Sequence, residues 1–132
     1  MNTRNIIKLF KDNYNIAVGE NFVPNHHGGL NLDISGIVFN LHAGVDISTA
    51  KISFISLNYE TNDRKELYKA LEKIKTYFDI EVDIEYGLDF STAFITSWKI
   101  DDELNISTKL ILYDWINSSI PRYKIELRIE KE

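Results

Sequence analysis

Residues 79–103, DIEVDIEYGLDFSTAFITSWKIDDE, form the stretch around which we expect the fold to be organised. Its first part alternates between apolar and acidic side chains. The apolar set is Ile80, Val82, Ile84 and Tyr86, and the acidic set is Glu81, Asp83 and Glu85. A period of two residues is typical of a strand with one buried face and one solvated face. The sequence therefore predicts a strand over residues 79–86, followed after Gly87 by a second strand over 90–100.

The segment before this stretch is the clearest helix in the chain. Residues 61–78 read TNDRKELYKALEKIKTYF, with Thr61, Asn62 or Asp63 as the expected N-cap. Apolar residues recur at helical spacing, at Leu67, Ala70, Leu71, Ile74, Tyr77 and Phe78. We predict an amphipathic helix over residues 62–78 that covers the apolar side of the strand that follows it. A shorter helix is expected near the N-terminus, over residues 3–12.

The segment 28–44, GGLNLDISGIVFNLHAG, predicts a β-hairpin. Its apolar phase changes at Ser35-Gly36, and a two-residue turn there brings all the apolar residues to one face. The expected pairs are Ile34 with Ile37, Leu32 with Phe39, and Leu30 with Leu41. A bulge at Gly36 within one long strand is the alternative interpretation.

The remaining strands are expected at residues 50–59, 104–116 and 122–130, separated by short polar turns at 101–103 and 117–121. Residues 50–59 are apolar on both faces, which favours a central strand. Short turns favour antiparallel neighbours. We therefore predict a single α+β domain over residues 1–132. In it, an antiparallel sheet of about six strands carries the main helix, 62–78, on one face.

Composition excludes several classes of function. The chain has 132 residues, no cysteine and a net charge of −5, so disulfides, thiolate zinc sites and cysteine nucleophiles are excluded. No window is long and apolar enough for a signal-peptide core or a membrane span, so a cytoplasmic location is expected. We find no phosphate-binding glycine motif and no serine-nucleophile motif, and the sequence predicts no cofactor and no catalytic residue.

Acidic residues are concentrated in residues 79–103, which hold eight carboxylates and a single base, Lys99. Such an imbalance disfavours direct binding of nucleic acid or of anionic membranes and favours a basic protein partner. We expect a docking surface with an aromatic anchor. The candidates for this anchor are Tyr86, Trp98, Tyr113 and Trp115. The predicted partner-binding residues are Glu81, Asp83, Glu85, Asp89, Trp98, Asp101, Asp102 and Glu103. A solvated acidic surface without a partner is the alternative.

The three histidines offer the main alternative, a small metal-dependent enzyme that uses His26, His27 and His42. Asp33 and Asp46 lie nearby in the sequence, so a His/Asp site is geometrically possible. However, adjacent histidines on an extended loop usually point apart, and no metal-binding His spacing is present. The sequence therefore favours surface histidines and predicts no metal site.

The chain is similar in general type to bacterial immunity proteins and to phage-encoded inhibitors of host defence enzymes, many of which are small, acidic and cysteine-free. This likeness is compositional and rests on no motif. It implies a non-enzymatic inhibitor, either an immunity protein against a basic toxin such as a nuclease or an anti-CRISPR-like protein that imitates nucleic-acid charge. A homodimer is a further possibility, through an exposed edge strand expected at residues 122–130.

Overall fold

The computed structural model describes residues 3–21, 31–80, 93–101, 105–114 and 119–131. It contains two helices, α1 (Thr3–Tyr14) and α2 (Arg64–Phe78). The strands are β1 (Asn31–Ile34), β2 (Ile37–Val45), β3 (Ile52–Thr61), β4 (Ala93–Asp101), β5 (Ile106–Asp114) and β6 (Tyr123–Lys131). The predicted α+β class is confirmed. The predicted strand at 79–86 lies outside the described residues from position 81 onward.

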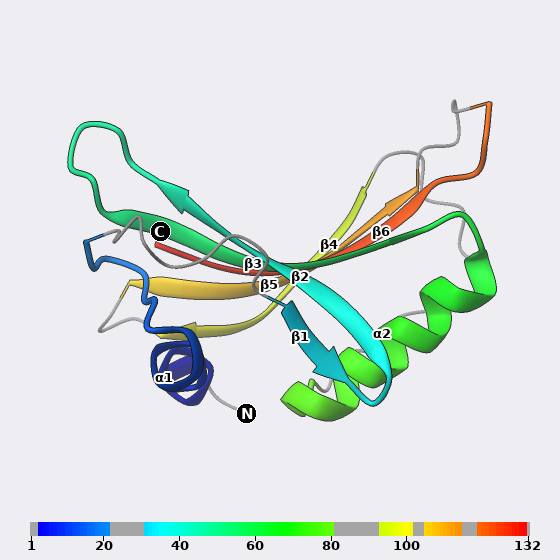
Figure 1. Cartoon of the computed structure of the whole chain (residues 1–132), viewed down its shortest axis with the longest axis horizontal. Helices are drawn as coiled ribbons and strands as arrows, with labels where there is room; N and C mark the ends of the chain where they lie inside the picture. Colours follow the sequence, from blue (N-terminus) through cyan, green and yellow to red (C-terminus); the bar gives the residue numbers. More distant parts are fainter. Residues whose placement is uncertain (1–2, 22–30, 81–92, 102–104, 115–118, 132) are drawn as a thin grey trace.

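The strands form one sheet in the order β1-β2-β3-β6-β5-β4, and every neighbouring pair is antiparallel. Figure 1 shows a strongly twisted sheet with both helices on the same side. The last strand, β6, lies between β3 and β5. The prediction that residues 122–130 form an exposed edge strand is therefore wrong. Sequence position did not reveal this, because a C-terminal strand can enter the middle of a sheet when its neighbours leave a gap there.

The β1–β2 hairpin has the predicted register. Ile34 pairs with Ile37 and Leu32 with Phe39 across the Ser35-Gly36 turn, while Leu30 lies outside the described residues. Both turn residues have positive φ, 50° at Ser35 and 91° at Gly36. This combination is the one that a type I′ turn requires, and its twist matches that of the strands. The hairpin interpretation is confirmed, and the single-strand alternative is wrong.

Helix α2 begins two residues later than predicted. The Asp63 side chain accepts a hydrogen bond from the Lys65 backbone N–H, so Asp63 is the N-cap and the first helical residue is Arg64. At the other end, Asp79 adopts a left-handed conformation and its N–H reaches the carbonyls of Lys75 and Thr76. The predicted apolar stripe is confirmed except at Tyr77, which is 40% exposed. Its buried members are Leu67, Ala70, Leu71, Ile74 and Phe78.

A single hydrophobic core lies between the sheet and the helices. Ile6 and Phe10 of α1 and the stripe of α2 pack against the same side of the sheet. Helix α2 contacts β1, β3 and β6, whereas α1 contacts β4 and β5. Among the strands whose side chains are described, the sheet contributes alternate residues, including Ile55, Leu57, Leu110, Leu112, Ile125 and Leu127. Because side chains alternate along a strand, the residues between these belong to the opposite face.

Two predicted boundaries are wrong. Strand β3 begins at Ile52 rather than at residue 50, because Ala50 has a positive φ in the turn that precedes it. Asp101 pairs with Ile106 as the last residue of β4, although the sequence placed it in a turn. Strand β2 continues to Val45 and includes His42.

Neither helix of the described chain is long and apolar enough to cross a membrane.

Candidate functional site

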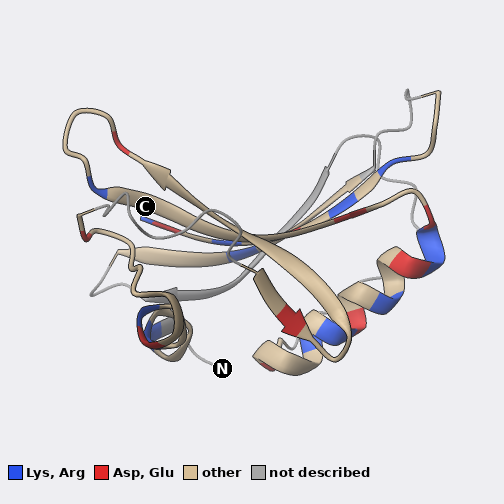
Figure 2. Ribbon diagram, viewed as in Figure 1, with Lys and Arg blue, Asp and Glu red and all other residues tan. Residues whose placement is uncertain are grey.

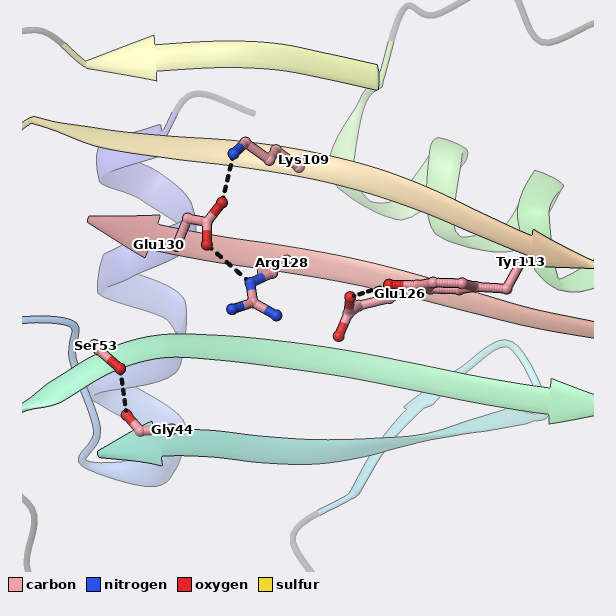
Figure 3. A network of polar contacts seen from close by, with 7 residues as sticks. All are labelled: Gly44, Ser53, Lys109, Tyr113, Glu126, Arg128 and Glu130. Carbon is pink, nitrogen blue, oxygen red and sulfur yellow. Dashed lines mark hydrogen bonds and ion pairs between the residues drawn. The ribbon is translucent and has the colours of Figure 1, made fainter. Parts of the chain in front are cut away.

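The sheet has a second face, opposite the helices, that carries polar and charged side chains. We call it the polar face, and it is defined by Asn40 and His42 of β2, Phe54, Ser56 and Asn58 of β3, Lys124, Glu126, Arg128 and Glu130 of β6, and Lys109 and Tyr113 of β5. Figure 3 shows polar contacts that connect Lys109 and Tyr113 of β5 with Glu130 and Glu126 of β6. The Arg128 guanidinium of β6 lies over the Phe54 ring of β3. This face is the best-developed candidate site among the described residues.

Glu130 is at the centre of the first group of contacts. The Lys109 ammonium and the Arg128 Nε both donate to its carboxylate, the latter at 2.9 Å. These side chains are only 22–29% exposed. Burial alone raises the pKa of Glu130, but the hydrogen bonds from Lys109 and Arg128 outweigh it and hold the pKa below its ordinary value. The Arg128 guanidinium also stacks on the Phe54 ring, 3.8 Å from its centroid.

Glu126 anchors a second group. The Tyr113 hydroxyl donates to Glu126 Oε1 at 3.1 Å, and the Lys124 ammonium lies 5.2 Å from the centre of the Tyr113 ring. Burial raises the pKa of Tyr113, and the charge of Glu126 and the hydrogen bond to it raise it further. Tyr113, predicted as an anchor for a partner, is thus occupied by contacts within the sheet.

Ser56 and Asn58 complete the row on β3. The Asn58 Nδ2 donates to Ser56 Oγ at 2.9 Å. Asn58 is 7% exposed, and its Oδ1 has no hydrogen-bond partner among the described residues. Buried polar atoms without a partner are uncommon in folded proteins, and each one calls for an explanation.

A pocket of about 500 Å³ opens on the polar face between β2, β3 and β6. Its volume lies in the usual range for small-molecule sites. The lining residues used below are Phe54, Asn58, Lys124, Glu126 and Arg128.

The structure brings together few of the residues predicted to bind a partner. Glu81, Asp83, Glu85, Asp89, Asp102 and Glu103 lie outside the described residues. Trp98 and Asp101 are on β4, at one end of the strand order, and only their backbone is described. Tyr86 and Trp115 are also outside the described residues. The predicted docking surface therefore stays a prediction.

The backbone nevertheless fixes where the acidic stretch attaches. Residues 79–92 connect the end of α2 to the start of β4, and residues 102–104 connect β4 to β5. Both acidic segments thus flank β4. By contrast, α2 carries five basic and two acidic residues, and Figure 2 shows the two signs interspersed along it. The acidic stretch and the net-positive helix therefore differ in the sign of their charge, although the stretch begins at Asp79, the C-cap of α2.

The histidine alternative gains nothing from the described residues. His42 is exposed on β2, and no group of three His, Cys, Asp or Glu side chains in the described ranges could hold a metal ion. His26 and His27 lie outside those ranges. Asp33 accepts a hydrogen bond from the Gly36 N–H, and Asp46 accepts from Ser48. Both aspartates thus stabilise turns.

Comparisons with protein-family models, with curated protein sequences and with solved structures find no match to the chain.

The sequence interpretation missed the polar face as a site. Residues 123–130 showed the right alternation, with Lys124, Glu126 and Arg128 on one face, but the partners of these side chains come from β3 and β5. The polar face can be identified only from the strand order, which places β6 between those two strands.

Proposed function

We propose that this protein is a non-enzymatic inhibitor, a cytoplasmic immunity protein that neutralises a basic toxin through its acidic stretch. The observation that carries the proposal is the concentration of eight carboxylates and one base in residues 79–103. Its two acidic segments precede and follow β4 in the sequence, and β4 ends the strand order of the antiparallel sheet. An acidic surface speeds encounter with a cationic partner and disfavours acidic ones.

The mechanism would be steric and electrostatic. The acidic residues would cover a cationic substrate cleft of the toxin, such as that of a nuclease. Partner affinity would come from one or two aromatic anchors, and Trp98 is a candidate whose backbone lies on β4. Mixed charges on the polar face and the basic excess on α2 make these surfaces less suited to such a partner.

The test is affinity capture from the native organism, with the partner identified by mass spectrometry. The test variant reverses three charges, Glu81→Lys, Asp83→Lys and Glu85→Lys. A matched control reverses three exposed helical acids, Asp12→Lys, Glu66→Lys and Glu72→Lys, and so has the same net charge. We expect the wild type and the control to capture a basic protein at low salt and to inactivate it. The test variant should associate with this protein at least tenfold more slowly.

Two results would contradict the proposal. One is a partner that binds the test variant and the wild type at the same rate at low salt. The other is a partner that keeps its full activity when saturated with this protein.

A further inference from the structure

Two buried hydrogen-bond acceptors lie side by side in the pocket of the polar face. Asn58 of β3 and Glu126 of β6 are direct cross-strand partners, and both line the pocket. Directly opposed residues have Cβ atoms about 5 Å apart, so one small group can contact both side chains. Asn58 is 7% and Glu126 5% exposed.

Both side chains have acceptor capacity that no described residue uses. The Asn58 Oδ1 has no hydrogen-bond partner among them, and Glu126 accepts only the Tyr113 hydroxyl, at Oε1. The nearby cations do not neutralise Glu126, because Lys109 and Arg128 both bind Glu130. A buried carboxylate with one neutral donor is costly, and a charged donor would lower that cost.

Two cations flank these acceptors and also have unused capacity. Lys124 and Arg128 are two residues before and after Glu126 on the same strand face, at about 7 Å. The Arg128 Nε donates a hydrogen bond to Glu130, and the face of the Arg128 guanidinium lies over the Phe54 ring. Its terminal nitrogens have no hydrogen-bond partner among the described residues. Lys124 forms no ion pair there and rests on the Tyr113 ring.

We propose that this pocket binds a small zwitterion of the α-amino acid type. The ligand ammonium donates to Asn58 Oδ1 and to the Glu126 carboxylate, and the ligand carboxylate accepts from the terminal nitrogens of Arg128. The pocket volume of about 500 Å³ leaves room for a side chain as well. This site is independent of the acidic stretch and of the proposed inhibition.

The mixture of charges decides between a zwitterion and simpler ligands. A purely cationic amine would satisfy Asn58 and Glu126 but would meet two cations within about 7 Å. An inorganic anion would satisfy Arg128 and leave both buried acceptors without a donor. A group with a positive and a negative charge a few ångström apart satisfies both halves of the pocket.

The test begins with the wild-type chain and each standard amino acid, screened for a rise in Tm. Binding of the best one is then measured by calorimetry beside two matched probes, its N-acetyl derivative and its decarboxylated amine. Acetylation removes the ammonium, and decarboxylation removes the anion. We expect each probe to bind at least tenfold more weakly than the amino acid.

Variants connect the binding to the two acceptors. Glu126→Gln keeps an oxygen for the Tyr113 hydroxyl and removes the charge, so we expect at least tenfold weaker binding and an unchanged or higher Tm. Asn58→Leu should act in the same direction. The matched control is Glu72→Gln on α2, a carboxylate outside this pocket whose side chain is 56% exposed, and it should bind as the wild type does.

Three results would overturn the proposal. The first is that no standard amino acid binds at millimolar concentration. The second is that the N-acetyl derivative or the amine binds as tightly as the amino acid. The third is that Glu126→Gln binds as tightly as Glu72→Gln while both remain folded.

Discussion

Gly44 and Phe54 are cross-strand partners on β2 and β3, and the Phe54 ring occupies the space where a side chain at position 44 would be. A Cβ built on Gly44 would be 2.0 Å from the ring, far inside van der Waals contact. The Arg128 guanidinium lies over the same ring, 3.8 Å from its centroid. The absence of a side chain at Gly44 therefore leaves room for the ring that contacts the charged network of the polar face.

Gly44→Ala should lower the free energy of unfolding by about 1–2 kcal/mol. The added methyl group must displace the Phe54 ring, an overpacking cost that exceeds the entropic gain of replacing glycine. Urea denaturation measures the change. The control is a double-mutant cycle with Phe54→Ala, in which Gly44→Ala should become neutral or stabilising. An equal loss in both backgrounds would mean that the ring is not the cause.

Glu130→Gln should lower the free energy of unfolding by about 1–2 kcal/mol at pH 7, because it removes the charge that Lys109 and Arg128 bind. The folded-state pKa of Glu130 is below its ordinary value of 4.5. The folded state therefore binds fewer protons than the unfolded state in that window, so the stabilisation is present above pH 4.5 and is lost as the pH falls through the folded-state pKa.

Stability curves of Glu130→Gln and the wild type should thus be separated at neutral pH and converge as the pH falls below 4.5 and through the folded-state pKa of Glu130. The control is Glu72→Gln, whose side chain is 56% exposed and 3.9 Å from Lys75. An exposed pair contributes little, so this variant should follow the wild type at every pH. A constant gap between Glu130→Gln and the wild type down to acidic pH would contradict the assigned role.

Local patterns predicted much of the fold. The apolar stripe of α2 and the phase change at Ser35-Gly36 each involve neighbours within a few residues, so periodicity alone was sufficient. Strand order was not predictable in the same way. The position of β6 between β3 and β5 depends on how distant segments pair, and alternation identifies a strand without naming its neighbours.

The two candidate sites differ in the same way, because one follows from composition and the other depends on strand pairing. Charge counting found the acidic stretch, because charge is a property of composition. It could not find the pocket, since Asn58 and Glu126 are 68 positions apart and meet only through the β3–β6 register. The alternation of Lys124, Glu126 and Arg128 by itself indicates a solvated strand face, whereas Glu126 is in fact buried.

Asp63→Ala should lower the free energy of unfolding by about 1 kcal/mol, because the Lys65 N–H loses its capping acceptor at the start of α2. Asp63→Asn keeps a side-chain oxygen and should retain most of the stability. Thermal and urea unfolding of both variants measure the difference. Asn62→Ala is the control at the adjacent position. If this control lost as much as Asp63→Ala, the cap would be assigned to the wrong residue.

The Ser35-Gly36 turn allows opposite changes at adjacent positions. Gly36 has a φ of 91°, and a Cβ added there would meet no atom within 4 Å, so Gly36→Ala should cost about 1 kcal/mol from backbone strain alone. Ser35 has a φ of 50°, which Asn tolerates better, and Asn-Gly is the preferred type I′ pair. Ser35→Asn should therefore raise the urea midpoint while Gly36→Ala lowers it. A fall in both variants would be incompatible with a type I′ turn.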